Sequence, residues 1–196
     1  MNQQSPTELW GTRSLDRARR WLERIRSLAE GSIENTTVSD QVRQDIEDFV
    51  AAAVGEATEV LEKAKTQLEN AYAGRGESKR RAQERALAFV NDWLRPRPLM
   101  RGILAVRHLD VHVEGRYSGR LLQISPGDPA NFFKAWWTFP GIPPAQHALL
   151  RASSQLTPDE LAQFNQHMLE TNLLDVLSEM IADVSDFQSA LAAELR

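Results

Sequence analysis

The longest helical pattern in the sequence covers residues 42–72. Apolar residues recur there at intervals of three and four: Val42, Ile46, Phe49, Ala53, Ala57, Val60, Ala64, Leu68 and Tyr72. A helix that keeps this period is about 50 Å long at a rise of about 1.5 Å per residue. Because such a helix is longer than a domain of this size is wide, it must pack along another helix or a second subunit.

Shorter amphipathic stretches on both sides of this segment predict further helices. Apolar residues return at helical spacing over residues 13–30, 79–94, 99–113, 157–169 and 173–195. The clearest start signal is Thr157, because Pro158 takes the first helical position and Glu160 completes a capping box. Together they predict one all-α domain over residues 1–196. We expect an antiparallel helical bundle of five or six helices, with its helical core in residues 13–114 and 156–196.

Residues 115–155 break the helical pattern. The part from Pro126 to Pro144 holds five of the nine prolines and a group of aromatic residues: Phe132, Phe133, Trp136, Trp137 and Phe139. Proline removes a backbone donor and disfavours helix before it. We therefore predict an irregular insertion that packs its aromatic side chains against the helices.

The composition excludes several classes of protein. The chain has no cysteine, which rules out disulfides, thiolate metal sites and a cysteine nucleophile. It has no run of about 18 apolar residues, which a membrane-spanning helix needs. The first 30 residues lack the apolar stretch of a signal peptide. We therefore expect a cytoplasmic protein with no membrane partner.

Charge is distributed unevenly along the chain. The formal net charge is −4, which argues against a general nucleic-acid coat. Residues 75–120 hold eleven Lys and Arg against five Asp and Glu, whereas residues 156–196 hold one Arg against eight acids. Either the acidic C-terminal helices neutralise the basic middle, or the basic middle faces a phosphate-rich ligand.

The densest group of potential catalytic side chains is the segment Arg107-His108-Leu109-Asp110-Val111-His112. It lies inside the predicted helix 99–113 and inside the basic middle of the chain. An arginine that is always charged stands next to one histidine and five residues before another.

This segment resembles the signature of the HEPN superfamily (higher eukaryotes and prokaryotes nucleotide-binding domains), which is an Arg, a polar residue, three further residues and a His. Arg107 matches the Arg, His108 the polar position and His112 the terminal His. The resemblance implies a small helical bundle that acts as a metal-independent endoribonuclease or RNA-binding effector, without a cofactor. It further implies a homodimer whose two motifs line one cleft, and a role in a toxin–antitoxin or phage-defence system with an antitoxin or other protein partner. The insertion is a departure from the compact family pattern.

The residue types suit that chemistry. A ribonuclease needs a base for the 2′-hydroxyl proton and a fixed cation for the charge that grows on the phosphoryl oxygens. We expect His112 to be the general base or acid, Arg107 to hold the phosphate, and His108 to orient Arg107 or the ligand. Arg101 and Arg116, from the same basic segment, are the predicted substrate-binding residues.

Helix geometry adds a condition. Residues five apart lie about 140° apart around a helix axis, so Arg107 and His112 do not share one face. A second protomer can supply the missing partner, which predicts a dimer with this helix near the twofold axis.

Three other interpretations of the motif remain open. Arg107 and Asp110 have the spacing of a helical ion pair, with His112 as a partly buried core histidine. His108 and His112 have the spacing of metal ligands for a metal-dependent hydrolase, with a distant acid, His147 or His167 as the third ligand. The chain could also be a non-catalytic helical interaction or scaffold protein.

Two other groups could contact RNA. The arginines of residues 13–30 form one face of a helix, and they either bind phosphates or pair with acids such as Glu47, Asp48 or Glu56. Trp136 and Trp137 either stack on bases or anchor the insertion to the core.

Overall fold

The computed structural model describes residues 12–32, 40–112, 141–142, 146 and 156–196. In this part of the chain the long elements are six α-helices and there is no strand: α1 (Thr12–Ser32), α2 (Asp40–Gly74), α3 (Lys79–Leu94), α4 (Pro98–His112), α6 (Pro158–Glu170) and α7 (Leu173–Glu194). The all-α prediction is therefore confirmed. None of the described helices is long and apolar enough to cross a membrane.

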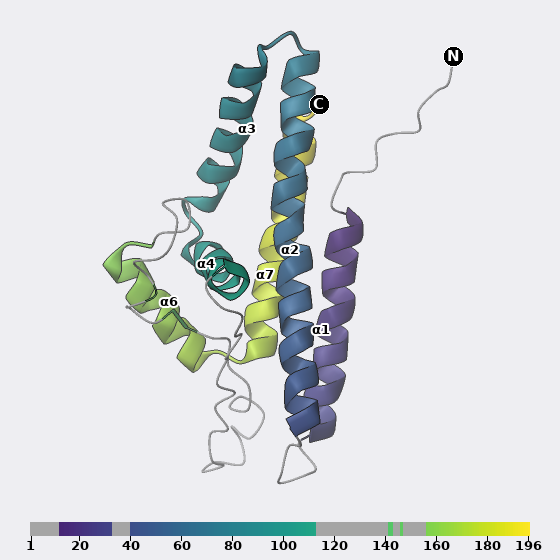
Figure 1. The fold of residues 1–196 in the computed structure, drawn as a ribbon, viewed down its shortest axis with the longest axis vertical. Helices are drawn as coiled ribbons and strands as arrows, with labels where there is room; N and C mark the ends of the chain where they lie inside the picture. The colour runs from purple at the N-terminus through teal and green to yellow at the C-terminus, as the bar shows by residue number, and fades with distance from the viewer. Residues whose placement is uncertain (1–11, 33–39, 113–140, 143–145, 147–155) are drawn as a thin grey trace, which may run out of the picture.

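The long helix α2 packs along other helices of the same chain. α1 and α7 lie beside it over much of its length, and α3 packs on its C-terminal half (Figure 1). α1 and α3 run antiparallel to α2, whereas α7 runs parallel to it, so that Tyr72 near the end of α2 meets Glu194 at the end of α7. The parallel arrangement arises because α4 and α6 bring the chain back to the start of α2 before α7 begins.

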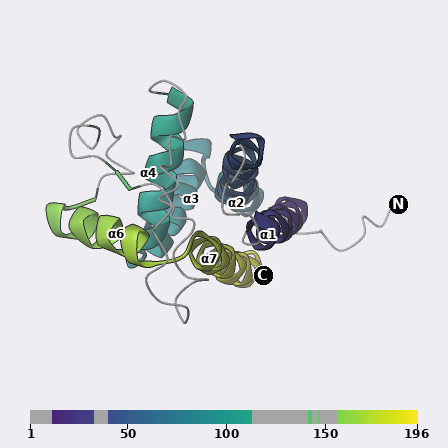
Figure 2. The ribbon, with the colours of Figure 1, turned by 90° about the horizontal axis from the view of Figure 1, so that it is seen from below.

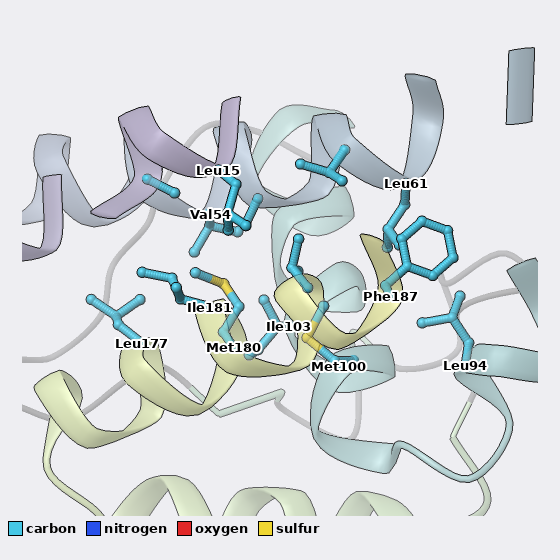
Figure 3. Close-up of a cluster of buried hydrophobic side chains, with 14 of the residues drawn as sticks. Leu15, Val54, Leu61, Leu94, Met100, Ile103, Leu177, Met180, Ile181 and Phe187 are labelled. Atoms are coloured by element: carbon cyan, nitrogen blue, oxygen red, sulfur yellow. The ribbon is translucent and has the colours of Figure 1, made fainter. Parts of the chain in front are cut away.

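The core lies where α1, α2, α4 and α7 meet. Figure 3 shows side chains from these helices interdigitating, with Leu15, Val54, Ile103 and Met180 all buried. Phe187 is fully buried and contacts the rings of Phe89 and Trp93 on α3. This core accounts for the helical spacing of apolar residues in the sequence.

α4 crosses the bundle, and α6 covers its outer side. α4 appears nearly end-on in Figure 1 and lengthwise in Figure 2. The contact between the two helices depends on Gly102, because a Cβ atom at that position would overlap the buried ring of Phe164. The glycine therefore sets how closely α6 approaches α4.

Most of the predicted insertion, with its aromatic group, lies outside the described residues. Ile142 is the described exception and is buried. The Asn165 side chain of α6 accepts a hydrogen bond from the Ile142 amide at 2.7 Å and donates one to its carbonyl at 3.0 Å. These two bonds tie the chain at Ile142 to α6.

Candidate functional site

The HEPN-like segment occupies the last turns of α4. One side of this helix is buried in the core through Met100, Ile103 and Val106, while Arg101, Arg107 and His108 are partly buried. From the helical period, positions 101, 108 and 112 follow one stripe, and position 107 lies about 100–140° away from it. The described helix therefore keeps the geometric separation that the sequence predicts.

Arg107 differs from the other partly buried arginines. Five arginines of the described residues are partly buried, and four of them have a carboxylate partner: Arg17 with Glu56, Arg26 with Glu23, Arg97 with Asp183 and Arg101 with Glu160. Arg107 has no hydrogen-bond or ion-pair partner within the described part of the chain. The Asp110 side chain lies outside the described residues, so the predicted Arg107–Asp110 pair stays a prediction.

The two histidines of the motif are described to different depths. His108 is partly buried and makes an interaction of its own. His112 is the last residue of α4, and its side chain lies outside the described residues. Its proposed role as acid or base therefore rests on its position and residue type.

Arg101 is engaged within the protein. Its guanidinium donates a hydrogen bond to Glu160, and this pair joins α4 to the start of α6. The same carboxylate accepts hydrogen bonds from the Thr157 amide at 2.8 Å and hydroxyl at 3.0 Å, completing the capping box that the sequence predicts. The Thr157 amide, with Arg101 and the Thr157 hydroxyl, holds the pKa of Glu160 below its usual value, although burial opposes the shift. The structure thus gives Arg101 a partner on α6, and its predicted contact with substrate stays a prediction.

Other predicted ligand residues lie elsewhere. Arg116, His147, Trp136 and Trp137 fall outside the described residues. No group of three or more His, Asp and Glu with metal-binding geometry occurs among the residues that the structure describes. His167 lies beside the start of α4, about 15 Å along the helix from His108 by residue count.

The arginine-rich face of α1 is paired with acids. Arg17 contacts Glu56 of α2 at 2.5 Å, and Ser14 donates a hydrogen bond to Glu59 at 2.8 Å. Lys63 completes this network, because it lies 3.1 Å from Glu59 and 3.2 Å from Ser14. Two further pairs, Arg19–Asp16 and Arg26–Glu23, lie within α1, and Arg24 stacks over Trp21. Of the two interpretations offered for these arginines, the structure supports pairing with acids.

The acidic C-terminal helices neutralise part of the basic middle. Three arginines of the middle segment contact acids of α6 and α7: Arg85 with Glu194, Arg97 with Asp183 and Arg101 with Glu160. Arg107 has no such contact among the described residues. It is therefore the partly buried cation of the described chain that internal pairing leaves over.

Comparisons with known proteins add no relative. No protein-family model, no curated protein and no solved structure matches this chain.

Proposed function

We propose that this chain is a HEPN-like, metal-independent endoribonuclease that acts as a homodimer. The observation that carries the proposal is Arg107, a partly buried guanidinium with no partner among the described residues, on the helix that also holds His108 and His112. A cation left without an internal partner in a partly desolvated position is suited to bind a phosphate.

The proposed reaction uses the nucleophile that RNA itself carries. His112 of one protomer accepts the 2′-hydroxyl proton as the 2′-oxygen attacks the adjacent phosphorus. Arg107 stabilises the negative charge on the phosphoryl oxygens. The bond to the 5′-oxygen breaks, and that oxygen takes up a proton. The products are a 2′,3′-cyclic phosphate and a 5′-hydroxyl, and no metal takes part.

The first experiment measures cleavage of mixed-sequence RNA in EDTA. The variants are His112→Ala and Arg107→Ala, and Arg20→Ala is the matched control because Arg20 is an exposed arginine of α1 without a partner among the described residues. We expect wild type and Arg20→Ala to produce cyclic phosphate ends, and the two motif variants to lose this activity. Cleavage that survives His112→Ala would contradict the assignment of the base. Absence of both cleavage and RNA binding in the wild type would favour a helical interaction protein instead.

A second experiment tests the shared cleft. Mixing the inactive Arg107→Ala and His112→Ala proteins produces heterodimers in which one of the two composite sites is intact. If the site combines Arg107 of one protomer with His112 of the other, the mixture regains about a quarter of the wild-type activity. A mixture that stays inactive, or a wild type that is monomeric by light scattering, would exclude the shared site.

A further inference from the structure

A pocket opens where the start of α4 meets α6 and α7, away from the HEPN-like segment (Figure 2). Its volume is about 330 Å³, and its lining is Pro98, Leu99, Gln163, Phe164, His167 and Glu179. This volume lies at the lower end of the range of small-molecule sites, which is about 300–1,000 Å³. The sequence offers no signal for this pocket because its lining comes from three helices that are far apart in the chain.

The floor of the pocket is apolar and fixed. Leu99 is partly buried and Phe164 is buried. The ring of Phe164 is held against Gly102, where no side chain separates the two helices. Such a floor favours the apolar body of a ligand and does not have to rearrange to receive it.

The rim carries an oriented histidine. His167 Nδ1 lies 3.2 Å from Thr171 Oγ1, and His167 Nε2 lies 3.1 Å from Glu179 Oε2. In the neutral ring, the Thr171 hydroxyl donates to Nδ1 and the Nε2 proton goes to Glu179. Both ring nitrogens are then occupied, and the remaining polar group at the rim is the Glu179 carboxylate, whose second oxygen has no partner among the described residues.

The surroundings of the rim are negative. Asp183 and Asp186 follow Glu179 on α7, and Arg97 is already committed to Asp183 and to the Trp93 carbonyl. Burial raises the pKa of Asp183, Asp186 and Glu179 add to the shift, and Arg97 opposes it. The C-terminal end of α6, with its negative dipole, also lies here at Thr171. A permanent cation that would balance Glu179 is absent from the described residues.

We propose that this pocket binds a small organic cation, an ammonium compound with one apolar ring. The ring packs on Leu99 and Phe164, and the ammonium group pairs with Glu179. The site is independent of the proposed ribonuclease activity, because it lies at the opposite end of α4 and shares no residue with the motif.

The test compares three probes that have the same body and different ends: phenylbutylamine, phenylbutanol and phenylbutyrate. Binding is followed by amide shifts in two-dimensional NMR spectra and by calorimetry. We expect saturable binding of the amine, binding of the alcohol about three- to tenfold weaker, and no binding of the acid at millimolar concentration. The shifted amides should belong to Leu99, Phe164, His167 and Glu179.

Three variants separate the contributions. Glu179→Gln should bring the amine down to the affinity of the alcohol, while the alcohol binds as before. Gln163→Trp, at an exposed rim position, should fill the pocket and abolish binding of both. Asp175→Asn removes a charge from the same helix outside the pocket and should change neither. Circular dichroism checks that each variant is folded.

Three results would overturn the proposal: no saturable shift with any probe, equal binding of the amine and the acid, or a preference for the amine that survives Glu179→Gln. The last result would place the cation on another acid of α7.

Discussion

The contact between α1 and α2 and the contact between α4 and α6 use polar side chains in different ways. Between α1 and α2, Arg17, Lys63, Glu56 and Glu59 form a balanced network around the buried Ser14, in which every member has a partner. On α4 and α6, Arg101 and Glu160 are paired, but Arg107 and the second oxygen of Glu179 have no partner among the described residues. A satisfied network stabilises the fold, whereas unpaired groups are available to a ligand. The difference directs the search for function to α4 and α6.

The largest effect is expected in the bundle core. Phe187→Ala removes a fully buried ring that contacts Phe89, Trp93 and the helices around it. We expect the free energy of unfolding to fall by about 3–5 kcal/mol, as for other buried aromatic residues. Urea unfolding followed by circular dichroism measures this change. A loss below about 1 kcal/mol would mean that α7 is not fixed in the core as described.

A smaller loss is expected where α4 meets α6. Gly102→Ala introduces a methyl group that overlaps the buried Phe164 ring, so one of the two helices must shift. We expect a loss of about 1–3 kcal/mol, the usual cost of overpacking. Hydrogen exchange should show faster opening of α6 with α2 unchanged, and equal acceleration in both helices would contradict the separation of the two regions. The matched control is Gly55→Ala in α2, where an added Cβ meets nothing within 4 Å.

Arg101→Met tests the paired arginine of α4. The change removes the partner of Glu160, a carboxylate of which 27% is exposed and which also caps α6. We expect a loss of about 1–2 kcal/mol, on the scale of hydrogen bonds to charged groups. The double variant with Glu160→Gln should cost less than the sum of the two single changes, because each removes the same interaction. Strict additivity would mean that the pair contributes nothing.

The pH dependence of stability distinguishes two carboxylates. Hydrogen bonds from Ser14 and Lys63 hold the pKa of Glu59 below its usual value, so its contribution is present above the unfolded-state pKa and is lost as the pH falls through the lower folded-state pKa. Burial raises the pKa of Asp183, so protonation of Asp183 stabilises the fold as the pH falls through that raised value.

At pH 7 we therefore expect opposite results from two neutral substitutions. Glu59→Gln should lower the free energy of unfolding by about 0.5 kcal/mol, the scale of partly exposed ion pairs. Asp183→Asn should leave it unchanged or raise it. Urea titrations at pH 7 and pH 4 measure both effects. A larger loss from Asp183→Asn than from Glu59→Gln would show that the Arg97 pair outweighs the burial of Asp183.

The helices could be predicted because their signals are local. The apolar period of residues 42–72 predicts α2, which extends from Asp40 to Gly74, and Thr157 with Glu160 predicts the start of α6. The positive φ of Gly76, 90°, likewise fits the end predicted there. The contacts between helices could not be predicted in the same way. The second oxygen of Glu160 meets Arg101, and Tyr72 meets Glu194, 122 residues later, only because of how the helices cross.

The candidate site divides along the same line. The motif on α4 follows from residue types and spacing. The absence of a described partner for Arg107, and the pocket between Leu99, Phe164 and Glu179, follow from packing that no local pattern contains.

The smallest expected effect on stability belongs to Arg107. Arg107→Met keeps the length of the aliphatic part of the side chain and removes a charge that has no partner among the described residues. We expect the free energy of unfolding to change by less than about 0.5 kcal/mol, in contrast to Arg101→Met on the same helix. If the protein cleaves or binds RNA, that activity should fall while the stability stays, because the charge acts on the ligand and not on the fold. A loss of stability as large as that of Arg101→Met would reveal an internal acid partner, such as Asp110, and would leave Arg107 a structural residue with no charge to offer a phosphate.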